Sequence, residues 1–279
     1  MHCDAGSEAM LAESGVLAYT AFAAAGSVAG GREMMMLTGE LTWIGLAIAV
    51  IVGWLAGAAG NWAADILPHL GVDRGQADRR GFPLWHYLTL PWYPFRKGVC
   101  PHCGELCPRR APSLEVGTIA VFTLAWLRVP GDLTLLLVTW CYAIFLLTVL
   151  VIDLEHRRVL NVMLIPAAVA ALLFSLLPGT PQPLNALLGA AVGLGVFLLL
   201  ALIGRGALGA GDVKLAAVIG LMTGYPGVLT ALVIGIALGG VAALALLITR
   251  RAGRKSFMAY APYLSLGALA VLLGLLGGR

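Results

Sequence analysis

Two aspartates, Asp153 and Asp212, stand at the ends of long apolar stretches of this chain. Asp153 closes the run TWCYAIFLLTVLVI, and Asp212 lies in the glycine-rich stretch GALGAGDVKL. An ionised carboxylate at the edge of a membrane is costly to desolvate, so two of them in comparable places indicate a function. Two neighbouring carboxylates can share one proton and activate a water molecule. These residue types therefore predict acid–base chemistry carried out on water by Asp153 and Asp212.

The residues around Asp212 support this interpretation. Gly209 and Gly211 let the backbone bend at a helix start and let another helix or a peptide come close. A helix N-terminus favours the ionised carboxylate, and Lys214 adds a positive charge. The alternative is that Asp212 is the N-cap of a helix in a glycine-rich turn. Lys214 would then serve only to orient the chain in a membrane.

The composition is that of a membrane protein. The 279 residues are 60% hydrophobic and 11% charged, with a mean hydropathy of +0.92, whereas about a quarter of the residues of a soluble domain are charged. A helix needs about 20 apolar residues to cross a bilayer. The sequence predicts an all-α polytopic membrane protein with about eight transmembrane helices and one sizeable cytoplasmic loop. The expected spans are 41–67, 112–129, 133–152, 159–177, 184–204, 213–225, 227–249 and 259–278.

The distribution of basic residues predicts the orientation in the membrane. Fifteen of the 18 Lys and Arg residues fall in four segments that eight spans would place on one side. These segments are 68–111, 153–158, 205–214 and 250–257. Because basic loops stay in the cytoplasm, both aspartates are expected at the cytoplasmic face of the inner membrane, with the N-terminus outside.

Four regions follow from this layout. Residues 1–40 are an N-terminal tail, which is either an external tail or the product of a misassigned gene start, because three methionines (34–36) directly precede the first strong span. Residues 41–67 are the first transmembrane helix, and 68–111 are a basic cytoplasmic loop with a Cys-x-x-Cys motif. Residues 112–279 are the transmembrane core.

Several stretches together resemble the type IV prepilin peptidases, which are leader peptidases and aspartic proteases with a GxGD motif. The sequence DLEHRRVLN, which begins at Asp153, is followed about 50 residues later by GAGDVKLAAVIGLMTG, which contains Asp212. Further similar segments are GAAGNWAADILP (57–68), RAPSLE (110–115) and FMAYAPYLSLGAL (257–269). The resemblance covers roughly residues 41–278.

The resemblance implies an endopeptidase that removes the short basic leader of type IV prepilins or pseudopilins at the cytoplasmic face. Asp153 and Asp212 would be its catalytic residues, and the peptidase reaction would need no cofactor. Many members also methylate the new N-terminus with S-adenosylmethionine. The expected partners are the precursors and membrane lipid, and no nucleic acid. Three acidic residues, Asp65, Glu115 and Glu155, are candidates for docking a basic leader, although the sequence around Glu155 favours a solvated turn with Arg157 and Arg158.

The cysteine motif departs from the family. Many members carry two Cys-x-x-Cys pairs, a pattern suited to tetrahedral zinc, whereas this chain has no cysteine between residues 4 and 99. Cys100 and Cys103 resemble the second pair. Cys107, His102 or His86 would have to complete a zinc site; the alternatives are free thiols or a site shared between chains.

Three other interpretations compete. A proton-coupled transporter also uses carboxylates inside a bundle, but the sequence shows no inverted repeat. A scaffold protein would need no active site, and it predicts that Asp153→Asn and Asp212→Asn are silent. Within the peptidases, the runner-up is a preflagellin-type enzyme.

Overall fold

The computed structural model describes most of the chain beyond residue 41. The described residues are 42–69, 84–91, 93, 99–100, 104, 106–129, 131–204, 209–249 and 260–275. The chain divides into two units, Met1–Ile48 and Ala49–Arg279. Of the first unit the structure describes only residues 42–48, the beginning of a long helix, so the site lies wholly within the second unit.

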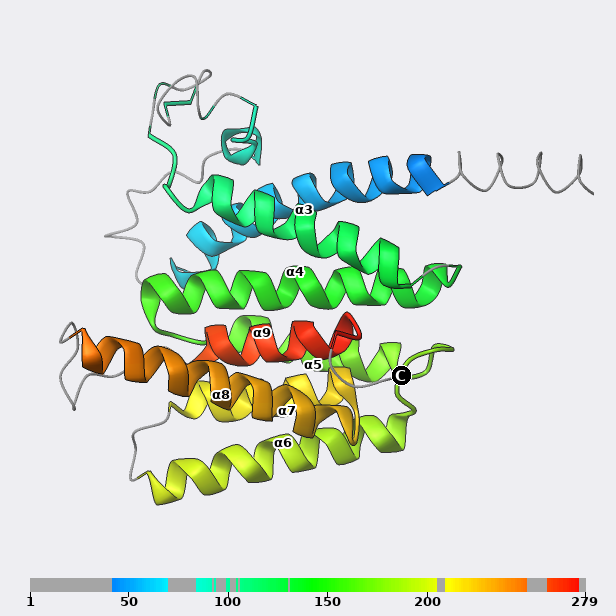
Figure 1. Cartoon of the computed structure of the whole chain (residues 1–279), viewed down its shortest axis with the longest axis vertical. Helices are drawn as coiled ribbons and strands as arrows, with labels where there is room; N and C mark the ends of the chain where they lie inside the picture. The colour runs from blue at the N-terminus through cyan, green and yellow to red at the C-terminus, as the bar shows by residue number, and fades with distance from the viewer. Residues whose placement is uncertain are drawn as a thin grey trace, which may run out of the picture. The chain divides into compact units, whose positions relative to one another are not determined.

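Most of the described residues are helical, and each α-helix overlaps one of the predicted spans (Figure 1). The only β-pairing among them is one isolated antiparallel bridge, between Val99 and Leu106. The first long helix is Thr42–Ile66, followed by the short 3-10 helices η1 (Leu67–His69) and η2 (Leu84–Tyr87). The later helices are α3 (Ala111–Arg128), α4 (Leu133–His156), α5 (Asn161–Phe174), α6 (Pro183–Ile203), α7 (Ala210–Thr223), α8 (Gly227–Ile248) and α9 (Ala261–Leu272).

The prediction of an all-α polytopic membrane protein is confirmed. Four described helices are long and apolar enough to cross a membrane: Thr42–Ile66, α4, α6 and α8. The helices α5 and α9 are apolar but shorter, and α7 has 14 residues. The count of eight crossings therefore stays a prediction.

The helix ends follow from local sequence signals. Asp132 caps α4, because its side chain accepts a hydrogen bond of 2.9 Å from the backbone N–H of Leu135. Proline stands in the first turn of α3, α6 and α9, where its missing N–H costs nothing. The glycines at 131 and 179, in the turns after α3 and α5, have positive φ angles of 84° and 80°.

Small residues let the later helices pack closely. A Cβ placed on Gly220 of α7 would lie 2.1 Å from the carbonyl oxygen of Gly189 in α6, so both positions require glycine. Gly267 of α9 meets the carbonyl oxygen of Ala231 in α8 in the same way, with a Cβ distance of 2.3 Å. These contacts hold α6 to α7 and α8 to α9.

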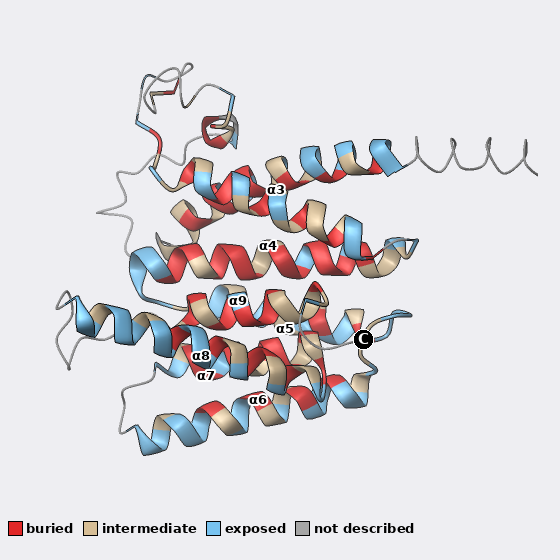
Figure 2. Cartoon of the chain, in the orientation of Figure 1, coloured by how far each residue is buried: buried red, intermediate tan, exposed pale blue. Residues whose placement is uncertain are grey.

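Burial differs sharply between the long helices (Figure 2). The most apolar window of α4 is 67% buried, because α4 packs against both α3 and α9, whereas the corresponding windows of α6 and α8 are 22% buried. Large apolar side chains such as Leu198, Leu202 and Val241 are exposed on α6 and α8. An apolar surface of this kind suits a lipid environment. Among the four long helices, the most buried one, α4, carries Asp153.

Candidate functional site

Asp153 lies in the last turn of α4 and is 3% exposed. The backbone N–H of Ala261, the first residue of α9, is a hydrogen-bond donor to its carboxylate. The other carboxylate oxygen, Oδ2, is buried and has no hydrogen-bond partner among the described residues. A buried carboxylate oxygen is costly without a partner, so Asp153 is suited to accept a proton or to bind water.

Asp212 lies in the first turn of α7 and is 9% exposed. Gly209 is the N-cap of this helix, and its backbone N–H donates a hydrogen bond back to the Asp212 carboxylate, as in a capping box. A Cβ on Gly209 would stand 3.3 Å from Asp212 Oδ2. The backbone at residue 209 therefore fixes the carboxylate while leaving little room for a side chain. Asp212 is thus not the N-cap that one interpretation of the sequence expected.

Gly211 brings the two aspartates to the same place. A Cβ on Gly211 would lie 2.9 Å from the Cβ of Val159, in the turn between α4 and α5. The absence of a side chain at 211 lets the start of α7 approach the end of α4. The two carboxylates interact electrostatically across this junction.

A cavity of about 390 Å³ opens at this junction. Its lining contains both aspartates together with the basic and polar residues of the α4–α5 turn. The lining residues are Asp153, Arg157, Arg158, Val159, Leu160, Asn161, Gly209, Gly211 and Asp212. A water molecule or a peptide bond that enters this cavity would meet both carboxyl groups.

Lys214 does not pair with either aspartate. Its Nζ donates a hydrogen bond of 3.1 Å to Oδ1 of Asn161, the first residue of α5. This contact ties the start of α7 to the start of α5, so Lys214 acts on the shape of the cavity. The role of Asn161 was not expected from the sequence.

Two of the acidic docking candidates are already paired within the protein. Arg110 forms ion pairs with both Asp65 and Glu155, and the hydroxyl of Tyr87 donates a hydrogen bond to Asp65. Burial, together with the neighbouring Asp65 carboxylate, raises the pKa of Tyr87 above its usual range. This cluster joins the end of the first helix, η2, the start of α3 and the end of α4.

The third candidate, Glu115, is fully buried. Its carboxylate accepts hydrogen bonds from Trp54 Nε1 (2.8 Å), from the backbone N–H and hydroxyl of Thr89 (2.7 and 2.8 Å) and from the backbone N–H of Leu90 (2.9 Å). A carboxylate with four donors and no exposure cannot contact a substrate. The docking hypothesis for Glu115 is therefore wrong, and its role is to hold residues 89–90 against α3.

The described part of the cysteine loop supplies a pair of donors rather than a complete metal site. Cys107 Sγ lies 3.3 Å from His86 Nε2, near the roughly 3.5 Å that two ligands of one tetrahedral zinc would show. Cys100 is buried, and Cys103 lies outside the described residues. No group of three or more His, Cys, Asp or Glu suited to a metal occurs among the residues described.

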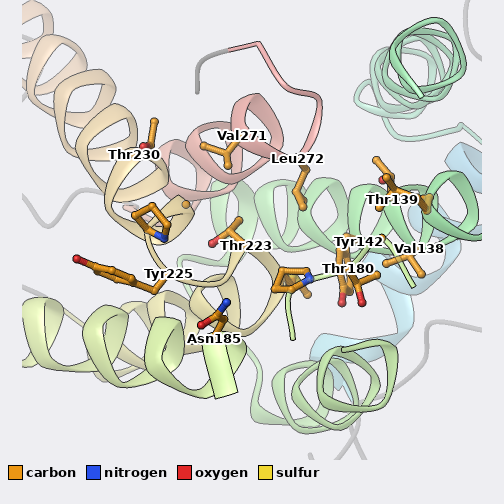
Figure 3. A pocket seen from close by; sticks show the side chains of 16 residues that line it. Val138, Thr139, Tyr142, Thr180, Asn185, Thr223, Tyr225, Thr230, Val271 and Leu272 are labelled. Atoms are coloured by element: carbon orange, nitrogen blue, oxygen red, sulfur yellow. The ribbon is translucent and has the colours of Figure 1, made fainter. Parts of the chain in front are cut away.

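A second cavity, of about 470 Å³, has no acidic or basic side chain in its lining (Figure 3). Threonines and tyrosines surround it, and its α7 residues begin at Met222, ten residues after Asp212. That separation is about 15 Å along a helix. Although larger, this cavity lacks groups for acid–base chemistry, so the smaller cavity is the candidate active site.

The fold and the cavity define a class: a helical membrane protein with two buried aspartates at one junction of its helices. Residues 140–244, which contain both aspartates, match the model of the type IV leader peptidase family. A prepilin leader peptidase/N-methyltransferase of Dickeya chrysanthemi is 30% identical over 250 residues, covering 78% of this chain and 84% of the relative. Another relative of the same name, from Bacillus subtilis (strain 168), is 28% identical over 240 residues, covering 82% of this chain and 94% of the relative.

A third relative of the same name, from Aeromonas salmonicida (strain A449), is 28% identical over 218 residues, covering 74% of this chain and 73% of the relative. No solved structure matches the chain. The chain belongs to the type IV leader peptidase family, and it is a peptidase. The resemblance seen in the sequence is confirmed.

Proposed function

We propose that this protein is an aspartic endopeptidase whose catalytic residues are Asp153 and Asp212. One observation carries the proposal: two buried carboxylates from α4 and α7 interact and line a single cavity. Family membership favours a peptidase over the transporter and scaffold interpretations. The two carboxyl groups account for a hydrolytic reaction without any other nucleophile.

The proposed reaction needs one ionised and one protonated aspartate. The ionised carboxylate takes a proton from a water molecule, and the water oxygen attacks the carbonyl carbon of the scissile bond. The protonated aspartate donates its proton to the carbonyl oxygen, which gives a neutral tetrahedral diol. When the C–N bond breaks, the leaving nitrogen receives the proton that the base took from water, and the other aspartate recovers its own.

The proposed substrates are the precursors of type IV pilins or pseudopilins, since the curated relatives are named as prepilin leader peptidases. Cleavage would remove the leader. A preflagellin-type substrate is the alternative, and the experiment below separates the two. With Asp65 and Glu155 engaged by Arg110, we do not assign a docking residue for the leader.

We also propose that the cavity opens toward the cytoplasm from the inner membrane. The α4–α5 turn carries Arg157 and Arg158, and Lys214 lies near the start of α7. Basic residues at membrane edges favour the cytoplasmic side. The leader, which is synthesised in the cytoplasm, would then reach Asp153 and Asp212 without crossing the membrane.

The relatives' names also include an N-methyltransferase activity. For this chain the transfer of a methyl group to the new N-terminus stays a proposal, with S-adenosylmethionine as the donor. Zinc in the cysteine loop is likewise a proposal. It depends on Cys103 joining Cys100 and the His86–Cys107 pair, and no step of the peptidase reaction requires it.

Cleavage of a co-expressed precursor tests the peptidase proposal. The wild type, Asp153→Asn and Asp212→Asn are expressed with a pilin precursor, and mass spectrometry identifies the N-terminus of the product. We expect the wild type to shorten the precursor and both variants to lose at least about 10³-fold of the rate, because neither Asn can exchange a proton. An added methyl group on the product would establish the second activity.

Asp132→Asn is the matched control, because asparagine caps a helix as well as aspartate and residue 132 lies outside the cavity. It should cleave at the wild-type rate. Cleavage by Asp153→Asn or Asp212→Asn at a rate near that of the wild type would exclude the proposed pair. Cleavage of a preflagellin but of no prepilin would replace the proposed substrate.

A further inference from the structure

Arg157 has an unusual backbone for its residue type. It is the C-cap of α4, with φ 52° and ψ 38°, which is the left-handed region. Among the described residues, it alone carries a side chain at positive φ. The same conformation is usually filled by glycine at the ends of helices.

The arginine carries an energetic cost at this position. A non-glycine residue in the left-handed region costs about 1 kcal/mol, which glycine would avoid. The backbone alone would therefore favour glycine at 157. The side chain must provide something that offsets this cost, and its surroundings suggest what that is.

The Arg157 side chain lines the same cavity as Asp153 and Asp212. Burial disfavours the charged form of the Asp153 carboxylate, and the positive charge of Arg157 opposes this effect by favouring the ionised form. The neighbouring charge that acts on Asp212 is Asp153 itself, which favours the protonated form of Asp212. The two aspartates therefore lie in different electrostatic surroundings although they share one cavity.

The other polar and charged groups near Asp153 do not remove this difference between the surroundings of Asp153 and Asp212. Ala261 supplies a backbone N–H from α9, and Tyr260, beside it, interacts with Asp212. Arg158 also lines the cavity. On α3, Arg110 is engaged by Asp65 and Glu155. Lys214 of α7 is bonded to Asn161.

We propose that Arg157 is a positioning residue that decides which aspartate carries the shared proton: it keeps Asp153 ionised as the base and leaves Asp212 as the acid. This inference rests on the proposed function. It assigns the role of base to Asp153 and the role of acid to Asp212, which the sequence alone does not distinguish. Arg157 is an exposed residue, so the effect of its charge weakens as salt screens it.

The pH dependence of cleavage tests the inference. Without the positive charge, Asp153 holds its proton to higher pH, so activity at the acidic end should be lost first. We expect Arg157→Gln to move the acidic limb of the pH–rate profile upward by up to about one pH unit. The limb of each variant is located relative to its own plateau rate, so that the shift is measured separately from any change in the plateau.

Two further variants separate charge from structure. Arg157→Gly fits the left-handed backbone and should fold at least as well as the wild type, yet show the same shift as Arg157→Gln. Arg157→Lys keeps the charge and should restore the wild-type limb. Arg109→Gln removes an exposed positive charge outside the cavity and should not move the limb.

The outcomes are distinct. The wild type could cleave the precursor while Arg157→Gln and Arg157→Gly show the same acidic limb of the pH–rate profile as the wild type. That result would overturn the inference and leave the proposed function standing. A uniform fall in rate at every pH would also overturn it, because that is the signature of a structural role. A wild type that cleaves no precursor would instead remove the proposed function.

Discussion

At the scale of single residues, burial separates acidic side chains that hold the structure from those available for chemistry. Glu115 and Asp153 are both almost fully buried. The Glu115 carboxylate is saturated by four hydrogen bonds, whereas Oδ2 of Asp153 has no partner among the described residues. A saturated carboxylate stabilises a fold, and an unsaturated one beside a second carboxylate is prepared for proton transfer.

Glu115→Gln should destabilise the protein without altering the catalytic groups. A glutamine offers one acceptor oxygen, so at least one of the donors at Trp54, Thr89 and Leu90 loses its partner and meets the amide NH₂. The expected loss is about 2 kcal/mol or more. Thermal unfolding in detergent would measure it, and proteolysis near residues 84–91 should become faster.

Glu155→Gln is the control for that change. Its ion pair with Arg110 is one-third exposed at the Glu155 side chain, and pairs of this kind contribute about 1 kcal/mol or less. A stability loss equal to that of Glu115→Gln would contradict the distinction between the two glutamates.

At the scale of the elements, the position of α7 against the end of α4 determines the site. Gly211→Ala should place a methyl group against Val159 and push the start of α7, with Asp212, away from Asp153. Overpacking of this kind costs about 1–3 kcal/mol. The cleavage rate of the folded protein should also fall, beyond what the lost stability explains, because a small displacement separates the two carboxyl groups.

The double variant Gly211→Ala with Val159→Ala removes the clash and should recover part of the lost rate. Gly117→Ala in α3 is the control, since a Cβ there has no neighbour within 4 Å, and it should stabilise the helix by about 0.5–1 kcal/mol. A Gly211→Ala enzyme with wild-type kinetics would show that the close approach is not needed.

The helices could be predicted from the sequence because apolar length and turn residues are local signals. The predicted span 41–67 corresponds to Thr42–Ile66, and 184–204 corresponds to α6 at Pro183–Ile203. The shortest predicted span, 213–225, corresponds to a helix, α7 at Ala210–Thr223. The helix begins three residues before the predicted start, after its N-cap Gly209, and ends two residues before the predicted end, ahead of its C-cap Gly224.

The side-chain contacts between distant segments could not be predicted in the same way. Trp54 and Glu115 are 61 residues apart, and Arg110 and Glu155 are 45 apart, so no periodic pattern relates them. The left-handed backbone conformation of Arg157 could not be predicted either, because an arginine after a helix gives no sequence signal for it. Asp153 and Asp212 were identifiable because a carboxylate at the end of an apolar run is itself unusual.

At the scale of the whole molecule, orientation decides whether a precursor can reach the cavity. Reporter fusions test this. Alkaline phosphatase joined after residue 179, in the α5–α6 turn, should be active outside the cytoplasm, whereas the same enzyme joined after residue 158 should be inactive. Green fluorescent protein at the same two positions should give the opposite pattern, because the basic α4–α5 turn stays inside.

A reversed pattern would place Asp153 and Asp212 outside the cytoplasm. The leader peptide would then meet the wrong face of the membrane, and the proposed substrate would have to be abandoned even if the carboxylate pair were correct. The orientation test is therefore independent of the catalytic test.

The proposed function requires Asp153 and Asp212 to act on a bound substrate as one catalytic pair. The most direct measurement uses purified protein in lipid vesicles, with a prepilin precursor at saturating concentration, and records binding and single-turnover cleavage in the same sample. We predict that Asp153→Asn and Asp212→Asn bind the precursor as the wild type does but cleave it at least about 10³-fold more slowly, while Asp132→Asn cleaves normally. Cleavage by either variant at a rate near that of the wild type would contradict the claim.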